Sequence, residues 1–333
     1  MRFAIDFLQV LILVGTAPLL RGIIGRIKAR IQNRRGASVW RPYADLRKLF
    51  SKEDLIPTAV YRPLYLLAPI ISLGCALIAI SVIPFGAPMG PKGVDLFEIS
   101  NINVGLLVIL GVTSVGVYGI ALAGWSSNNK YSLLGALRSS AQLISYELAL
   151  GLSLVGVVLR AGSLNLRVIV EQQATLGMAT WNIFGGCQFL AFFIYLMAAF
   201  AETNRSPFDL PEAESELTGG YHTEYSSMKF AMFFMAEYGN MINVGCVATL
   251  PFLGGWTSPF GDLMPPFQST FLNAFLPLFW FVIKVFLFLC LYIWVRGTLP
   301  RFRYDQLMNF GWRYLLPLAI LNIVGTSLWL AYR

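Results

Sequence analysis

The feature that most constrains the fold is a series of apolar stretches, each about 20 residues long, which recur along nearly the whole chain. About 20 residues of α-helix cross the hydrocarbon core of a bilayer. The chain is 56% hydrophobic and only 13% charged, and a soluble protein of this length needs more charge on its surface. The sequence therefore predicts an all-α, polytopic membrane protein that forms a single transmembrane domain over residues 1–333.

Eight transmembrane helices fit the apolar pattern. Their expected ranges are 4–24, 63–85, 103–124, 134–160, 180–201, 226–252, 271–295 and 313–331. After the first of them, residues 43–50 set Leu46, Leu49 and Phe50 at helical spacing between basic residues. This spacing predicts a short amphipathic helix that lies in the membrane interface.

The distribution of basic residues predicts the orientation. The loops between the eight spans are numbered from the N-terminus. Nineteen Lys and Arg residues lie in or beside the odd-numbered loops, and five lie on the other side. Cytoplasmic loops of membrane proteins carry the excess of basic residues. We therefore expect cytoplasmic loops at about 25–62, 125–133, 202–225 and 296–312, in the bacterial inner membrane or an equivalent membrane, with both termini on the opposite side.

The four cysteines do not suggest a metal centre. Cys75, Cys187, Cys246 and Cys290 each lie inside an apolar stretch, and no two have the spacing of metal or iron–sulfur ligands. We expect neither a metal site nor a redox cofactor bound to this chain.

Three ionisable residues lie within predicted spans. They are Glu147, Glu237 and Lys284, and each costs about 2.5–3.5 kcal/mol at the bilayer centre on insertion scales. One interpretation is a structural Glu–Lys pair that ties helices together. The other, which we favour, is a proton relay, because buried carboxylates and lysines can exchange protons near neutral pH.

The loop at 202–225, called the acidic loop below, contradicts the basic character expected of a cytoplasmic loop. It holds six of the seventeen acids and the single histidine, His222. Glu212 and Glu216 would share one helical face, where like charges repel and call for protonation or a basic partner. A merely solvated loop is the alternative, but it would have no need of the Phe, Leu, Tyr and Pro residues among these acids.

Several runs of residues match a known family. They are Gly124-Trp-Ser-Ser-Asn-Asn-Lys-Tyr-Ser-Leu-Leu-Gly-Ala-Leu-Arg138, Ser145-Tyr-Glu147, the whole of 201–238, and Arg303-Tyr-Asp-Gln-Leu-Met308 with Gly311-Trp312. On these runs the chain resembles, over nearly its entire length, the H-type membrane subunits of the bacterial NADH:quinone oxidoreductases, the complex I family. The resemblance implies a quinone chamber formed against a peripheral arm, and an acidic path from this chamber into the membrane.

The resemblance also implies roles for individual residues. The proton and coupling path would comprise Glu202, Asp209, Glu212, Glu214, Glu216 and Glu224 on the chamber side and Glu147 and Glu237 in the membrane. The quinone chamber and its entrance would comprise Gln32, Arg34, Gly36, Asp45, Lys48, Arg205 and Phe208. Ion-pair partners would be Lys284, Arg296 and Arg303.

The partners implied are quinone as substrate, membrane lipid and the other subunits of the complex, but no nucleic acid. These subunits are the peripheral-arm iron–sulfur and quinone-site subunits, small membrane subunits and antiporter-like subunits, and only partners would carry flavin and iron–sulfur clusters.

One departure keeps an alternative open. The family pattern has a Glu-Arg pair at the end of the first span and Gly-Pro-Asn farther on, where this chain has Ile24-Gly25-Arg26 and Gly36-Ala37-Ser38. The segment Arg26–Gly36, with Trp40-Arg-Pro-Tyr43, is closer to the membrane subunit of formate hydrogenlyase-type nickel–iron hydrogenases. A hydrogenase anchor is therefore the alternative function. A freestanding transporter is a weaker one, since the chain lacks the inverted repeat common in transporters.

Overall fold

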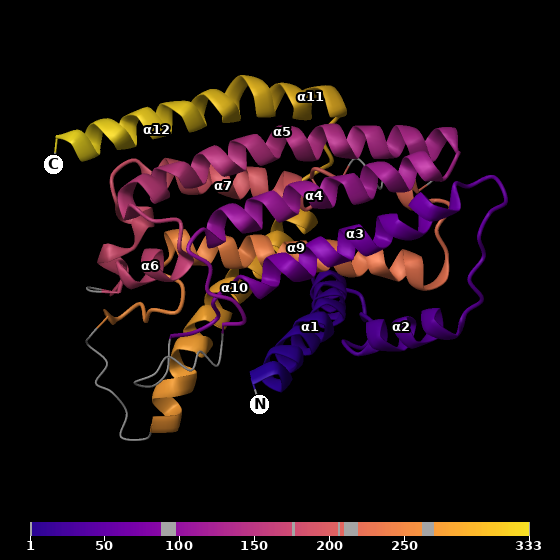
Figure 1. Cartoon of the computed structure of the whole chain (residues 1–333), viewed down its shortest axis with the longest axis horizontal. Coiled ribbons are helices and arrows are strands. Elements are labelled where there is room, and N and C mark those ends of the chain that lie inside the picture. Colours follow the sequence, from indigo (N-terminus) through magenta and orange to yellow (C-terminus); the bar gives the residue numbers. More distant parts are fainter. Residues whose placement is uncertain are drawn as a thin grey trace.

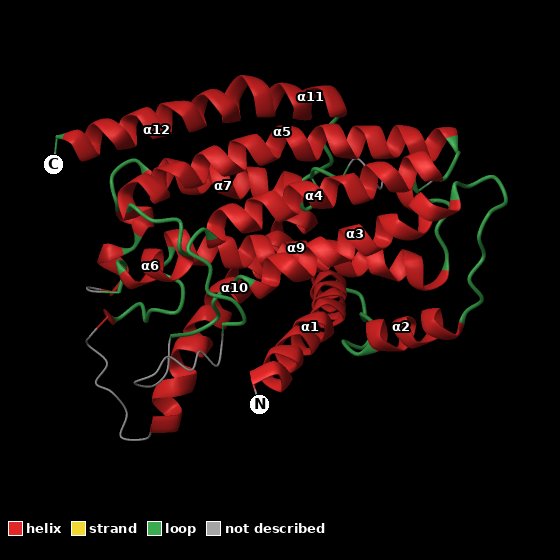
Figure 2. Cartoon of the chain, in the orientation of Figure 1, coloured by secondary structure: helices red, strands yellow, loops and turns green. Residues whose placement is uncertain are grey.

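The computed structural model describes residues 2–87, 98–174, 177–205, 207–209, 219–261 and 270–332, with backbone only for 2–13 and 270–274. Helices and loops make up this described part, and it contains no strand (Figure 2). The principal helices are α1 (Arg2–Ile31), α2 (Arg41–Ser51), α3 (Arg62–Ser81), α4 (Gly105–Ser126), α5 (Lys130–Ala161), α6 (Leu166–Glu171), α7 (Gln188–Glu202), α9 (Ser227–Phe252), α10 (Thr270–Thr298), α11 (Tyr304–Phe310) and α12 (Leu316–Ala331). The all-α membrane fold predicted from the sequence is confirmed.

Among the described residues, five helical segments are long and apolar enough to cross a bilayer. They are Arg62–Ser81, Gly105–Ser126, Lys130–Ala161, Phe275–Thr298 and Tyr304–Ala331. The helix α7 is apolar but only 15 residues long. The count of eight spans stays a prediction.

Several predicted boundaries differ from the structure. The first span, expected to end at residue 24, continues as α1 to Ile31. The span expected from residue 180 begins at Gln188, because Gly186 has a positive φ of 62° and ends a stretch of short 3-10 turns. The loop expected at 296–312 is mostly helical, because α10 continues to Thr298 and α11 begins at Tyr304. A five-residue π-helical turn, Gly311–Leu315, then joins α11 to α12.

The helix α9 organises the bundle. It packs against α3, α1, α10 and α7, and most of its side chains are buried. In Figure 1, α3, α4 and α5 run alongside one another, α12 follows α5, and α1 and α10 cross the bundle at a steeper angle. Any charged side chain on α9 is therefore surrounded by protein rather than lipid.

The first three odd-numbered loops meet at one end of the bundle. The backbone amide of Tyr61 donates to the carbonyl of Ser126 at 3.1 Å, and the hydroxyl of Ser132 donates to the carbonyl of Tyr221 at 2.9 Å. The side chain of Asn129 caps α5 by accepting from the amide of Tyr131. The acidic loop is thus anchored on the loops that precede α3 and α5.

The predicted amphipathic helix is α2. It lies beside α1 and α9 (Figure 1), and Tyr43 donates a hydrogen bond to the carbonyl of Gly15 on α1. Leu46 and Leu49 are half-buried, whereas Phe50 is 69% exposed. The two leucines therefore face the protein, and Phe50 remains available to the membrane interface.

Two glycines of α4 provide a test of the helix packing. A Cβ atom on Gly124 would overlap the side chain of Ala136 and the carbonyl of Ser132 on α5, whereas one on Gly111 would meet nothing within 4 Å. We expect Gly124→Ala to lower the stability by about 1–3 kcal/mol through overpacking. Gly111→Ala should be neutral or stabilising, since alanine is the better helix former. Thermal unfolding of the solubilised protein measures both, and equal effects would contradict the close α4–α5 contact.

Candidate functional site

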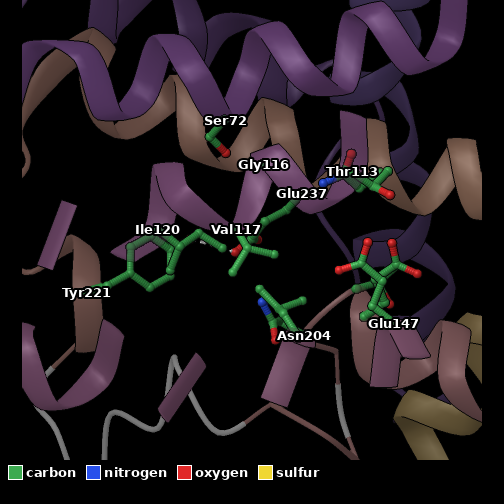
Figure 3. A pocket seen from close by; sticks show the side chains of 13 residues that line it. Ser72, Thr113, Gly116, Val117, Ile120, Glu147, Asn204, Tyr221 and Glu237 are labelled. Atoms are coloured by element: carbon green, nitrogen blue, oxygen red, sulfur yellow. Dashed lines mark hydrogen bonds between the residues drawn. The ribbon is translucent and has the colours of Figure 1, made fainter. Parts of the chain in front are cut away.

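Carboxyl groups from three helices line one internal cavity. Glu147 comes from α5, Glu202 is the last residue of α7, and Glu237 comes from α9. Asn204 and Tyr221 also belong to the wall of this cavity. Figure 3 shows Glu147, Asn204, Tyr221 and Glu237 around this common space. Acids that are far apart in the sequence are thus brought together by the fold.

Glu237 is held by two donors from the acidic loop. The Nη2 atom of Arg205 lies 3.0 Å from Oε2 of Glu237, and the hydroxyl of Tyr221 donates to Oε1 at 3.0 Å. Arg205 is only 5% exposed and lies over the ring of Tyr238, 4.4 Å from its centroid. Charge-assisted hydrogen bonds in a low-dielectric interior are stronger than those in water. The pair therefore fixes the start of the acidic loop against α9.

The other two carboxyl groups have different surroundings. Ser114 on α4 donates a hydrogen bond to Glu147. The Oε2 atom of Glu202 is buried and meets no hydrogen-bond donor among the described residues. A buried carboxyl oxygen without a donor carries a desolvation cost. Glu202 is therefore available to accept a proton or a hydrogen bond from within the cavity.

Other predicted residues of the acidic loop lie outside this cavity. Asp209 pairs with Arg301, with 3.3 Å between Oδ2 and Nη2. Phe208 is buried, and its ring centroid lies 5.9 Å from that of Tyr146. The amide of Asn129 donates to Oε1 of Glu224 at 2.6 Å. Predicted acids that lie outside the described residues are Glu212, Glu214 and Glu216.

A second, apolar hollow lies between α1, α2 and α9. Leu46, Leu49, Phe230 and Phe234 are among its lining residues. We call it the groove. Its charged lining residues are Asp45 and Arg21, and the guanidinium of Arg21 lies 5.0 Å from the ring centroid of Phe234.

The predicted entrance residues do not all gather at the groove. Asp45 lines it. In contrast, Gln32, Arg34 and Gly36 are exposed between α1 and α2, and Lys48 is exposed on α2. They lie on the outer surface of the basic loop (25–62) and not in the groove wall.

One segment of the chain contacts the walls of both hollows. Residues 219–229 are called the strap below. They include Tyr221, which lines the cavity of the three carboxyl groups (the acid cavity), and Ser227, which hydrogen-bonds Leu49 of the groove wall. Ser226 exchanges two hydrogen bonds with the backbone of Leu55, at 3.2 and 3.1 Å. The hydroxyl of Ser227 donates to the carbonyls of Leu49 and Lys52 at 2.8 and 3.0 Å.

Side chains reinforce the strap. The ammonium of Lys229 lies 2.8 Å from the carboxylate of Asp54. The rings of Tyr65 and Tyr225 stack with centroids 4.2 Å apart. Burial raises the pKa of Tyr225 to about 12, so its hydroxyl stays neutral and can hydrogen-bond to the carbonyl of Tyr65.

The predicted ion-pair partners have varied surroundings. Arg303 is exposed at the start of α11, and Arg296 lies in the last turn of α10. Asp209 is paired with Arg301, a residue that the sequence did not single out. Lys284 is buried and donates to backbone carbonyls. The roles predicted for Arg296 and Arg303 stay predictions.

Sequence reasoning missed several residues of the site. Tyr221 and Asn204 lie inside the run that carries the resemblance, but nothing in their spacing marks them as cavity residues. Asn204 has a positive φ of 48°, and asparagine is among the residues that tolerate this conformation. Ser114 and Arg21 lie in apolar helices. A polar residue in such a helix often marks a functional position, and this was the signal that could have found them.

Comparisons with known proteins agree on one family. The family model described as NADH dehydrogenase matches residues 5–327. A protein of Koribacter versatilis, named as an NADH-quinone oxidoreductase subunit of the H type, is 56% identical over 96% of this chain and 92% of its own length. A Solibacter usitatus protein with the same type of name is 46% identical over 96% of this chain and 94% of its own. A third relative so named, from Thermomicrobium roseum, is 45% identical over 98% and 95%.

The buried pair of Arg205 and Glu237 allows a stability test. Arg205→Met leaves the carboxylate of Glu237 without its cation, which costs about 3–5 kcal/mol for a buried pair. Adding Glu237→Gln removes the unpaired charge, so we expect the double variant to be more stable than Arg205→Met alone. A double-mutant cycle on thermal unfolding measures this coupling, and strictly additive effects would show that the two side chains do not interact.

Proposed function

The chain belongs to the NADH dehydrogenase family of H-type membrane subunits, and we propose that it forms much of a quinone-binding chamber and couples quinone reduction to proton translocation. It is a membrane subunit of an oxidoreductase complex. The coupling acids we propose are Glu147, Glu202 and Glu237 in the cavity, with Asp209 and Glu224 outside it. Three further acids complete the proposed path, namely Glu212, Glu214 and Glu216.

The groove supports the binding of a lipid-soluble substrate. Its wall is apolar and aromatic, and it is formed where the amphipathic helix α2 meets α1 and α9. A quinone that dissolves in the membrane needs an apolar passage with a few polar groups near its end. Asp45 and Arg21 are such groups. We assign the groove as part of the entrance, with the surface residues Gln32, Arg34, Gly36 and Lys48 at its outer side.

The acid cavity supports proton transfer. Reduction of a quinone to a quinol takes two electrons and two protons, so the site gains negative charge until protons arrive. The electrons would come from an iron–sulfur cluster of a neighbouring subunit. Carboxyl groups within one cavity can take up and release protons as the charge nearby changes. Glu202 and Glu147 would pass the response on from Glu237 into the membrane.

The observation that carries the proposal is the strap between the two hollows. Its Tyr221 hydrogen-bonds Glu237, and its Ser226 and Ser227 hydrogen-bond the segment that follows α2. A change in charge or occupancy at the groove would therefore shift Tyr221, the donor to Glu237 that lies on the strap. Such coupling needs an element that both sites bias, and the strap contacts both.

The same proposal covers cofactors, partners and orientation. We propose that the chain binds no redox group itself and that flavin and iron–sulfur clusters belong to partner subunits. Peripheral-arm, small membrane and antiporter-like subunits would be its neighbours, together with membrane lipid. The meeting of the first three odd-numbered loops at one end of the bundle supports a common side for them, which we propose is the cytoplasmic side of the inner membrane.

The hydrogenase alternative rests on the first loop, on the segments Arg26–Gly36 and Trp40–Tyr43. The relatives carry quinone oxidoreductase names, and their similarity to this chain extends over nearly their whole lengths. We therefore treat hydrogen evolution as an outcome that the first experiment must be able to detect.

That experiment uses the purified parent complex in liposomes. We expect NADH to reduce quinone, an inhibitor that blocks the quinone chamber to stop this, and a proton gradient to form. In Glu237→Gln, quinone reduction with an uncoupler should persist while the gradient is lost, because the amide cannot take up a proton. Glu171→Gln is the matched control, since Glu171 is an exposed partner of Arg167. Hydrogen evolution without quinone reduction would reject the proposal, and undiminished pumping by Glu237→Gln would reject the role of this acid.

A second test addresses the groove. Leu46→Trp places a larger ring into its wall, so we expect a severalfold higher KM for quinone and an unchanged reaction of the peripheral arm with dyes. Phe50→Trp lies on the exposed side of the same helix and is the matched control. Steady-state kinetics with a long-chain quinone measure both. An equal KM in the two variants would mean that quinone does not pass through the groove.

A further inference from the structure

Lys284 on α10 is buried in an unusual setting. Its ammonium donates to the carbonyls of Leu253, Gly255 and Thr257 at 2.7, 2.9 and 2.8 Å. The ring centroid of Trp181 lies 4.3 Å away. The residue is only 5% exposed, and no ion pair with a carboxylate is found within the part of the chain that the structure describes.

These contacts account for the whole ammonium group. A lysine ammonium has three N–H donors and no acceptor, and here each donor can have its own carbonyl. The face of Trp181 attracts the positive charge from another side. Oxygen atoms that surround a cation in this way, with an aromatic face beside them, would hold a monovalent cation whether or not it were attached to a side chain. Backbone dipoles hold the ammonium among the described residues, and the ion-pair role predicted for Lys284 from the sequence stays a prediction.

A turn with two left-handed glycines brings these carbonyls together. Gly254 and Gly255 follow the end of α9 with φ values of 68° and 51°, a conformation that side chains rarely adopt. A Cβ atom on Gly254 would lie 2.7 Å from Nε1 of Trp181. The amide of Gly254 donates to Oε1 of Gln173, and the amide of Gly255 donates to the carbonyl of Thr249. The turn is thus fixed from both sides.

The electrostatics of α9 favour a cation at this place. Leu253 is the C-cap of α9, and the carboxyl end of a helix carries a partial negative charge. At 1.5 Å per residue, the cap lies roughly 24 Å along α9 from Glu237. Lys284 is therefore remote from Glu237 and contacts the turn at the carboxyl end of α9.

We propose that the carbonyls of Leu253, Gly255 and Thr257, with the ring of Trp181, form a monovalent-cation site that is filled by the ammonium of Lys284. The site accepts a free primary alkylammonium ion when the lysine side chain is removed. Its role is to hold the turn at 253–257 against α10, and it takes no part in proton transfer. The proposal does not depend on quinone chemistry.

Chemical rescue tests the site directly. Lys284→Ala removes three carbons and the ammonium, so n-propylammonium is the matching free cation. We expect the variant complex in detergent to unfold at a lower temperature and to be cut faster by chymotrypsin after Trp256. Added propylammonium should restore at least half of the lost shift and slow the cleavage.

Two control compounds and one control variant separate charge and hydrogen bonding from filling of space. Propanol fills the space without charge, and propyltrimethylammonium has charge but no N–H donor, so neither should rescue. Lys284→Met keeps the length of the side chain without charge, and we expect it to remain unstable. Equal rescue by propanol, or wild-type stability of Lys284→Met, would overturn the proposal.

A failure of Lys284→Ala to assemble leaves the test intact. The yield of assembled complex then becomes the readout, and cells grown with propylammonium should regain it while cells grown with propanol should not. Equal failure with both compounds would overturn the cation site. Because none of these measurements involves quinone, the result is independent of the proposed function.

Discussion

A charge inside a membrane protein persists only where the protein itself replaces water around it, and this constraint applies at two places along α9. Within the helix, Glu237 is matched by the guanidinium of Arg205 and the hydroxyl of Tyr221. Beyond its last turn, the ammonium of Lys284 is matched by three carbonyls. The low dielectric of the interior makes each match strong and each mismatch costly. The central position of α9 allows both charges to be enclosed by neighbouring helices instead of lipid.

The surroundings of Glu237 and those of Lys284 differ in a way that matters for function. Arg205 and Tyr221 come from the acidic loop, which is connected through the strap to the groove, so the surroundings of Glu237 can change when that loop moves. The carbonyls around Lys284 belong to a turn fixed by Gln173 and by two glycines in left-handed conformations. A charge held by side chains on a connecting segment can respond to an event elsewhere, whereas a charge held by fixed backbone dipoles is stationary.

The strap is a physical connection through which the groove can be coupled to the acids of the cavity. Its contacts with the first loop and α3 are hydrogen bonds, one ion pair and one aromatic stack. Each of them joins residues that are more than 150 positions apart in the sequence. Each contact is modest, but together they fix the segment at both ends. A displacement at one end is then transmitted along the strap itself and does not require the lipid-facing helices to move.

The sequence by itself determined the all-α membrane class, the amphipathic helix after the first span, the family, and the anomaly of acids within and beside apolar segments. These properties depend on composition, periodicity and local motifs, which are readable without coordinates. Only the tertiary structure decided that Glu147, Glu202 and Glu237 share one cavity, that Arg205 is the partner of Glu237, and that Asp209 pairs with Arg301. It also decided that Lys284 binds carbonyls, because the left-handed glycines that turn those carbonyls inward have no periodic signature. Pairing across more than 30 residues depends on helix packing and rotation, which a linear pattern does not encode.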